Sequence, residues 1–357
     1  MDEIFKLLSA TNLGTVWEET VTNRIPYAGE TLFGTSKQYD LTLSMFKGSK
    51  GLPVALKPSS FDAKATIRPR IGVAKLETEI PFFREAFKLT EKDRRQLVAF
   101  RASAPELFAN IIEKIYDDAN NLVEGALAVN EQMRWSLLTD MTITVSSNEA
   151  DYDYDFDPSN SWHTDNFMQL AGQNLWTDFN NSNPLEDLQT GIDKIANKTG
   201  ETITKVYMNK VTFGLLRQNK NIKDAITINN NSFATVSKIR ELLLSELGIT
   251  VELYDKQFQK TQDNGTLVTE KFLKDGYVVM LPDGQIGTTV FAYTPEEIDA
   301  AALEGKGAEV SVVETGITLT SIVHEHPVTS EIICSELCLP TMTKADSIYV
   351  IKATASI

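Results

Sequence analysis

Cysteine, histidine and long apolar runs are scarce in this chain of 357 residues. The two cysteines are Cys334 and Cys338. If both lie on one strand, their spacing at ~3.3 Å per residue puts them about 13 Å apart, too far for a disulfide. We therefore expect two buried, reduced thiols and folding in a reducing compartment. No stretch is long and apolar enough for a transmembrane helix, and the N-terminus is unlike a secretory signal, so neither a membrane span nor export is expected.

Catalytic motifs are also absent. The chain has no P-loop, no Gly-x-Gly-x-x-Gly after a strand and no Gly-x-Ser-x-Gly. His324 and His326 offer two metal ligands on one strand face, without a third ligand at an informative spacing. The aspartates of 151–157 do not form an EF-hand, because Phe156 and Trp162 replace the required glycine and glutamate. We expect no catalytic residue, no cofactor and no metal site.

Charge of one sign dominates the chain, but unevenly. The net charge is −15 and the isoelectric point about 4.8, which excludes binding nucleic acid through a broad basic face. Residues 31–76 nevertheless hold eight basic and two acidic residues, a net of +6. Residues 135–193 hold eleven acids and no lysine or arginine. Such a chain can be complementary to copies of itself, the alternative being a solvated surface of uneven composition.

One long helix is predicted between Ser103 and Thr139. Ser103 and Glu106 match a capping box, and Pro105 suits the first helical turn. At ~1.5 Å per residue such a helix spans about 50 Å, which suits an elongated subunit that tiles a surface better than a compact domain. Apolar residues recur at steps of three and four: Leu107, Phe108, Ile111, Ile112, Ile115, Ala119, Leu122, Val123, Ala126 and Leu127.

Two hairpins are predicted on either side of this helix. Residues 39–46 and 63–71 alternate at period two around a Gly/Pro-rich tip, and this two-stranded hairpin needs support, plausibly from a neighbouring subunit. The second hairpin joins 141–145 to 151–157. Period two places Tyr152, Tyr154 and Phe156 on one of its faces and the four aspartates on the other.

The remaining segments frame these elements. Residues 1–30 predict a short helical start and then an irregular arm, and Thr90 and Asp93 open a short helix. The middle of the chain predicts a compact α/β unit with helices at 184–199, 210–218 and 235–247 and strands at 204–208, 249–254, 277–281 and 288–292. The C-terminal part predicts two further strands, 331–339 and 347–353.

This order of segments resembles the major capsid proteins of tailed bacteriophages, in particular the lambda E-like family with the Hong Kong 97-type fold. The resemblance covers nearly the whole chain and depends on the order and spacing of its parts. The local matches are Trp176 with 183–188, the run 254–258 followed by 264–265 and Phe272, the run 277–282, and the closing runs 331–340 and 346–351.

The resemblance implies an α+β fold of named parts. These are an N-terminal arm (1–30), an E-loop (31–76), a P domain (77–159) with a spine helix at about 104–139 and the hairpin 141–157 in its sheet, and an A domain (160–310). Residues 311–340 then return to the P domain as strands, and 341–357 add a C-terminal strand to the A domain.

The resemblance also implies a function. We expect a non-enzymatic major head protein that self-assembles into pentamers and hexamers of an icosahedral shell around double-stranded DNA. It would be assembled in the cytoplasm of a host bacterium and reside in the virion. Expected partners are a separate scaffolding protein (because only about 30 residues precede the first hairpin), a portal, decoration proteins, and DNA by weak non-specific contact.

The basic segment and the acidic hairpin supply the candidate assembly contacts. We expect the E-loop of one subunit to lie over the acidic P-domain surface of its neighbour. The candidates are Lys47, Lys57, Arg68 and Arg70 on the basic side and Asp151, Asp153 and Asp155 on the acidic side. Two alternatives stay open: another phage structural protein, such as a tail tube or minor head component, and a soluble α/β enzyme with its site in 184–300.

Overall fold

The computed structural model describes residues 6–22, 24–48, 73–146, 151–227, 234–261, 265–304 and 306–355. The chain divides into two compact units, and each is built from three segments. Unit 1 comprises Met1–Leu43, Glu77–Met133 and Thr288–Thr341. Unit 2 comprises Ser44–Leu76, Arg134–Gly287 and Met342–Ile357.

A sheet of six described strands forms the framework of unit 1. Its centre is β16 (Thr329–Met342), which pairs antiparallel with β15 (Ile317–His324) on one edge. The other edge of β16 pairs with β4 over Ser330–Leu337 and also with β13. The remaining bounds are β1 (Phe33–Gln38), β4 (Phe82–Leu89), β13 (Gly287–Ala292) and β14 (Ala308–Glu314), with the short helices α11 (Pro295–Ile298) and α12 (Ala300–Glu304) before β14. Cys334 and Cys338 lie on β16, buried and free, as predicted.

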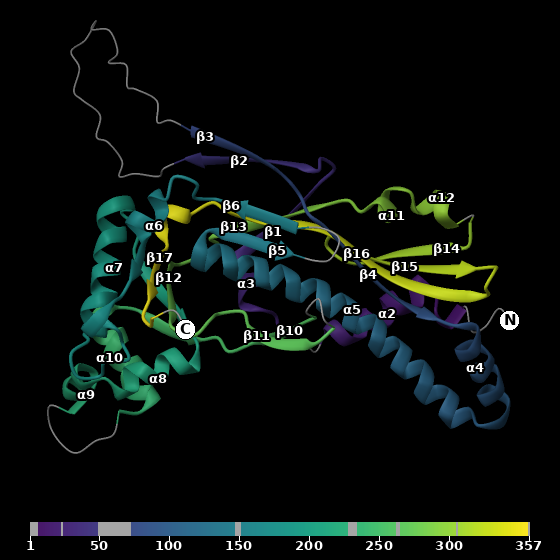
Figure 1. The fold of residues 1–357 in the computed structure, drawn as a ribbon, viewed down its shortest axis with the longest axis horizontal. Helices are drawn as coiled ribbons and strands as arrows, with labels where there is room; N and C mark the ends of the chain where they lie inside the picture. The colour runs from purple at the N-terminus through teal and green to yellow at the C-terminus, as the bar shows by residue number, and fades with distance from the viewer. Residues whose placement is uncertain are drawn as a thin grey trace, which may run out of the picture. The chain divides into compact units, whose positions relative to one another are not determined.

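The N-terminal segment is helical, contrary to the prediction of an irregular arm. Helix α2 (Ala10–Val21) lies against β14 and β15 in Figure 1, and α3 (Ala28–Leu32) follows it. Trp17 is fully buried, and its indole Nε1 donates to Glu314 at 3.2 Å. Many residues of α2 are polar, so the sequence shows only a weak helical repeat of apolar residues there. The apolar side chains of α2 are buried because the rest of unit 1 packs against them.

The predicted long helix is confirmed, although its predicted N-terminal cap is wrong. Helix α5 (Pro105–Asp140) has 36 residues, a length of about 54 Å. Ser103 does not cap it. Ser103 is the last residue of α4 (Glu91–Ser103), and its hydroxyl donates to the Ala99 carbonyl at 2.8 Å. Only Ala104, at φ −151°, separates the two helices.

The helix pair encloses the core of unit 1 together with α2 and the sheet. The predicted capping box at the start of α4 is present, because Thr90 and Asp93 exchange backbone and side-chain hydrogen bonds. The buried members of the core come from the N-terminal segment, β4, α4, α5, β15 and β16: Leu8, Leu13, Trp17, Leu89, Leu97, Ile112, Ile115, Ala119, Val123, Ile317, Leu319, Ile332 and Cys334.

A five-stranded sheet of order β7-β17-β12-β8-β9 forms the framework of unit 2. The sheet is mixed: β12 pairs antiparallel with β17 and β8, whereas β7 and β9 pair parallel with their neighbours. The strands are β7 (Phe167–Gln169), β8 (Ile203–Met208), β9 (Thr250–Leu253), β12 (Tyr277–Pro282) and β17 (Tyr349–Lys352). The predicted α/β unit is therefore present.

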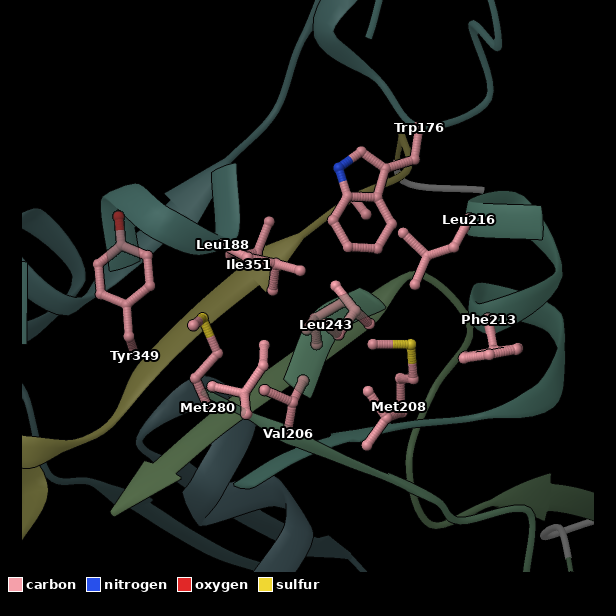
Figure 2. Packing of buried hydrophobic residues seen from close by; sticks show 14 of the residues in the cluster. Trp176, Leu188, Val206, Met208, Phe213, Leu216, Leu243, Met280, Tyr349 and Ile351 are labelled. Carbon is pink, nitrogen blue, oxygen red and sulfur yellow. The ribbon is translucent and has the colours of Figure 1, made fainter. Parts of the chain in front are cut away.

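Four helices pack on one face of this sheet and close a core around Val206, Met208 and Met280, drawn in Figure 2. Helix α7 starts with Pro184 and ends at Gly200, whose φ of 73° suits glycine. The helices are α7 (Pro184–Thr199), α8 (Lys210–Gln218), α9 (Lys220–Thr227) and α10 (Val236–Leu247). The sequence predicted α7, α8 and α10 and missed α9.

Three two-stranded sheets complete the described chain. They are β2 (Thr42–Gly48) with β3 (Val73–Glu79), β5 (Thr142–Ser146) with β6 (Asp151–Asp155), and β10 (Gln257–Thr261) with β11 (Leu267–Lys271). Strand β2 overlaps the first predicted strand at 39–46, but its partner β3 follows the predicted second strand at 63–71, which lies outside the described residues. The hairpin β5-β6 is confirmed, but its expected place in the P-domain sheet is wrong, since among the described strands it pairs only with itself.

The remaining short helices belong to unit 2: α6 (Ser161–Asn166) and the 3-10 turns Gly172–Asn174 and Ala345–Ser347. The two units cut the chain at other places than the predicted domains. Residues 134–159 fall in unit 2 and 288–310 in unit 1. Trp135 packs against Tyr207 and Tyr254, and β13 pairs with β16, which explains both differences.

Candidate assembly surfaces

The hairpin β5-β6 has one apolar face and one acidic face. Its register sets Ile143 opposite Tyr154 and Thr144 opposite Asp153. Ile143 is fully buried, whereas Asp153 and Asp155 are exposed. The Thr144 hydroxyl donates to Asp153 at 3.0 Å, which holds one carboxylate at the surface. The predicted acidic outer face is present at these two positions.

The predicted basic partners are mostly beyond what the structure describes. Lys47 lies on β2, and Asp151 is the first residue of β6. Lys57, Arg68 and Arg70 lie outside the described residues. The structure thus describes acidic residues of the candidate contact, and their pairing with basic side chains stays a prediction.

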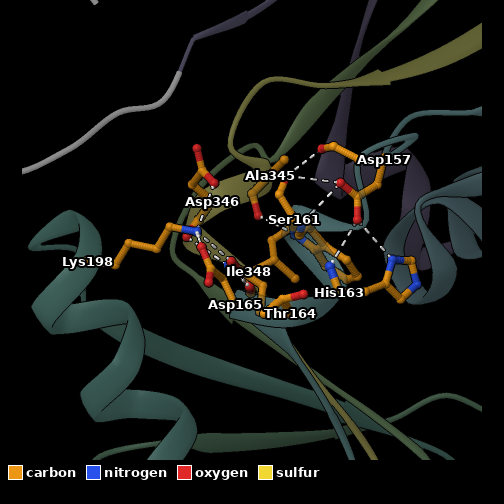
Figure 3. Close-up of polar contacts among 12 residues, drawn as sticks. Asp157, Ser161, His163, Thr164, Asp165, Lys198, Ala345, Asp346 and Ile348 are labelled. Atoms are coloured by element: carbon orange, nitrogen blue, oxygen red, sulfur yellow. Dashed lines mark hydrogen bonds and ion pairs between the residues drawn. The ribbon is translucent and has the colours of Figure 1, made fainter.

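Asp157 is a buried helix cap, so the prediction that all four aspartates share the outer face is wrong here. Its carboxylate accepts hydrogen bonds from the backbone N–H groups of Trp162 and His163, both at 3.0 Å, and from the Ser161 hydroxyl at 3.2 Å. His163 Nδ1 lies 3.1 Å from the same carboxylate. These contacts, drawn in Figure 3, satisfy the first turn of α6.

A second polar cluster joins α6 and α7 to the chain that precedes β17. The Lys198 ammonium lies 3.0 Å from the Asp165 carboxylate and 3.2 Å from that of Asp346, and it donates to the Asn166 side chain at 2.8 Å. The Asn166 amide in turn donates to the Ile348 carbonyl at 2.7 Å. Helix α6, which follows the acidic hairpin, is therefore held within unit 2 by side-chain contacts (Figure 3).

The start of the basic segment is anchored in unit 1 by contacts that the sequence does not reveal. The Lys37 ammonium lies 2.7 and 2.8 Å from the two carboxylate oxygens of Glu297 and 4.3 Å from the Tyr293 ring centroid. Tyr39 stacks on Tyr293 with their centroids 4.1 Å apart. Because Glu297 is 260 positions from Lys37, no local spacing predicts the pair.

The C-terminal end of α5 is held in unit 2 by aromatic packing. Trp135 is fully buried, stacks on Tyr254 at 5.0 Å and meets Tyr207 edge-on at 5.7 Å between centroids. The Tyr277 hydroxyl donates to Asp140 at 3.1 Å. Burial raises the pKa of Tyr277, and the Asp140 carboxylate raises it further.

Among the described residues, no three histidine, cysteine, aspartate or glutamate side chains gather as a metal-binding group. His324 Nε2 lies 3.1 Å from the Glu331 carboxylate, a single polar pair across β15 and β16. No helix in the described part of the chain is both long and apolar enough to cross a bilayer.

The model of phage major capsid protein E matches residues 9–349. The chain belongs to this family. No curated protein matches it. Solved structures agree with the family. A phage-related protein from Bordetella bronchiseptica RB50 is 13% identical over 97% of both chains, with a TM-score of 0.57.

Two further structures are similar to this capsid protein. A putative capsid protein of a prophage of E. coli CFT073 is 12% identical, with a TM-score of 0.59, over 97% of this chain and 99% of the other. The capsid of cyanophage A-1(L) is 12% identical, with a TM-score of 0.51, over 91% and 92%. The predicted α+β, Hong Kong 97-type fold is confirmed. The chain is a structural protein of the phage virion, and the family match favours the head protein over the tail-tube and minor-head alternatives.

Proposed function

We propose that this capsid protein assembles with copies of itself into the pentamers and hexamers of an icosahedral shell that encloses double-stranded DNA. The family match over residues 9–349 carries the proposal. The 36-residue helix and the uneven charge support it, because both suit a subunit completed by its neighbours. The parts are those expected above: arm 1–30, E-loop 31–76, P domain 77–159 with 311–340, and A domain 160–310 with 341–357.

The principal contact in this proposal joins the E-loop of one subunit to the acidic hairpin of the next. The E-loop carries a net charge of +6, and Asp153 and Asp155 are exposed on β6. Lys57, Arg68 and Arg70 would face some of Asp151, Asp153 and Asp155. Each exposed ion pair contributes at most ~1 kcal/mol, so the shell depends on many repeats of the contact.

The proposal also covers partners and location. The subunit works without catalysis and is assembled in the cytoplasm of a host bacterium with a separate scaffolding protein. A portal and decoration proteins join the shell. The net charge of −15 leaves only weak, non-specific contact with packaged DNA, and a repelling inner wall lets the DNA slide during packaging.

Reversal of Arg68 and Arg70 to glutamate tests the contact. We expect the double variant to lose closed shells while its subunit stays folded, because like charges then face each other across the interface. Shell yield is measured by sedimentation and negative-stain microscopy, and folding by circular dichroism. The scaffolding protein is co-expressed where assembly requires it.

The matched control changes the same two positions without changing their charge. Arg68→Lys with Arg70→Lys is expected to keep most of the shell yield. Adding Asp151→Arg and Asp153→Arg to the glutamate variant is expected to restore part of it. Normal shells from the glutamate variant refute the contact.

A further inference from the structure

Helix α4 turns Lys92 and Arg95 to solvent, beside the exposed Glu91, whose carboxylate accepts a hydrogen bond from the Val328 backbone N–H. Leu97 is its buried residue and packs in the core of unit 1. Lys92, Arg95 and Val98 point away from that side, and all three are exposed, Val98 to 57%. Ala99 is exposed on the same side of the helix, and its side chain is small, so a second helix can approach this face closely.

Helix α5 turns an acidic face to solvent along its first five turns. Glu106, Glu113, Asp117 and Glu124 are all exposed, at helical steps of seven, four and seven. They lie opposite the buried stripe of this helix in unit 1. At ~1.5 Å per residue the four carboxylates extend over about 27 Å.

We propose that the cationic face of α4 docks on the acidic face of α5 of a second copy of this chain. The inference rests on the proposed function, since it needs subunits that assemble, and it adds a contact separate from the E-loop and the hairpin. Charge complementarity favours a second copy as the occupant. Lys92 and Arg95 are three positions apart on α4, about one helical turn. Glu113 and Asp117 are four positions apart on α5, also about one turn, so the two charge pairs have similar spacing.

The symmetry of the contact supports the same choice. A joint between two different faces of one subunit is heterologous, so every copy gives its α4 to one neighbour and its α5 to another. Such a joint closes into a ring when the rotation between copies divides a full turn evenly, as a closed shell requires. Single exposed pairs are weak, and at 1 M salt the screening length falls to about 3 Å, so this contact weakens with salt.

Charge exchange tests which faces meet. We expect Lys92→Glu with Arg95→Glu to lose most shells, and Glu113→Lys with Asp117→Lys to lose them equally. Combining all four substitutions is expected to recover shells, because the two faces then exchange sign together. Circular dichroism and the thermal midpoint of each unassembled variant show whether it is folded.

Cysteine pairing tests the same neighbours directly. Arg95→Cys and Asp117→Cys are placed in separate copies, which are co-expressed and assembled into shells. Only a contact between copies can then join the two thiols, and the native Cys334 and Cys338 are buried. We expect a covalent dimer on a non-reducing gel from the mixed shells and none from shells of either variant alone.

Three results overturn the contact. They are unchanged shell yield from either charge reversal, no recovery in a folded fourfold variant, and mixed shells without the dimer. In one case of the first result, only the α5 reversal loses shells, which assigns the acidic face to another occupant, such as the E-loop or a scaffolding protein. If the unaltered chain forms no closed shell, the proposed function fails first and the contact with it.

Discussion

Asp153 and Asp157 are four residues apart, yet one lies at the surface and the other is buried under the first turn of α6. Removing the buried carboxylate with Asp157→Ala leaves two backbone N–H groups without their acceptor. We expect the free energy of unfolding to fall by about 2 kcal/mol, the upper end for a helix cap. Urea unfolding of the unassembled subunit, followed by tryptophan fluorescence, measures the loss.

Asp153→Ala is the matched control, because the same side chain is removed from an exposed position. Its effect is expected to stay within about 0.5 kcal/mol. Equal losses from the two variants would show that Asp157 is no cap.

Tyr277 gives the fold a sensitivity to alkali. Burial and the Asp140 carboxylate raise the pKa of Tyr277 above its ordinary value of 10.0. The unfolded chain therefore loses this proton at lower pH than the folded one. The contribution of this pKa difference to the free energy of unfolding is fully present below pH 10 and is lost as the pH rises above 10.

Replacing Tyr277 with phenylalanine removes this titration. We expect Tyr277→Phe to cost about 1 kcal/mol at pH 7 through the lost hydrogen bond and to lose stability less steeply above pH 10. Urea midpoints from pH 7 to 11 compare the two proteins. A decline equally steep in both contradicts the assignment.

Strand periodicity predicted the side chains of the acidic hairpin as far as the strand extends. It placed the exposed Asp153 and Asp155 and the buried Phe156 correctly. It failed at Asp157 because β6 ends at Asp155, and the next carboxylate serves a helix that starts four positions later. The turn formers of 158–160 are the local signal for this change.

At the scale of elements, the long helix was predictable, but its N-terminal cap was not. The Ser103 and Glu106 pattern fits a capping box, but α4 continues through Ser103, and a single residue separates the helices. Helix α2 was missed for a related reason. Leu13 and Trp17 are too few to form a strong apolar stripe, and the strands that bury them lie about 300 positions later.

Two helical glycines give opposite predictions for the same substitution. In α7, a Cβ at Gly191 would lie 2.6 Å from the Tyr349 ring and 2.9 Å from the Met280 sulfur. We expect Gly191→Ala to destabilise unit 2 by about 1–3 kcal/mol through overpacking. In α5, Gly125 has open space around it and is expected to gain about 0.5–1 kcal/mol as alanine.

Differential scanning calorimetry of the two variants measures both effects. The midpoint is expected to fall for Gly191→Ala and to rise for Gly125→Ala. A rise for both, or a fall for both, would contradict the packing described for these helices.

At the scale of the whole molecule, the segment order predicted the family and the fold, whereas the unit boundaries were beyond local patterns. The sheet of unit 1 combines strands from three distant parts of the chain: β1, β4, and β13 to β16. Such pairings depend on long-range contacts that periodicity does not contain. The ion pair between Lys37 and Glu297 also depends on a long-range contact.

The uneven charge distribution was also predictable, because it follows from the number of charged residues in each segment of the sequence. The structure adds where the charge lies: Asp153 and Asp155 on an exposed strand face, and the opposite charges of α4 and α5 on two helix faces. Under the proposed contacts, these surfaces are complementary to one another across copies.

Negative-stain electron microscopy of the assembled chain, purified with its scaffolding protein where that is required, tests the central claim most directly. Closed polyhedral shells of uniform diameter are the predicted result. Open tubes, or only small monodisperse particles, would contradict it.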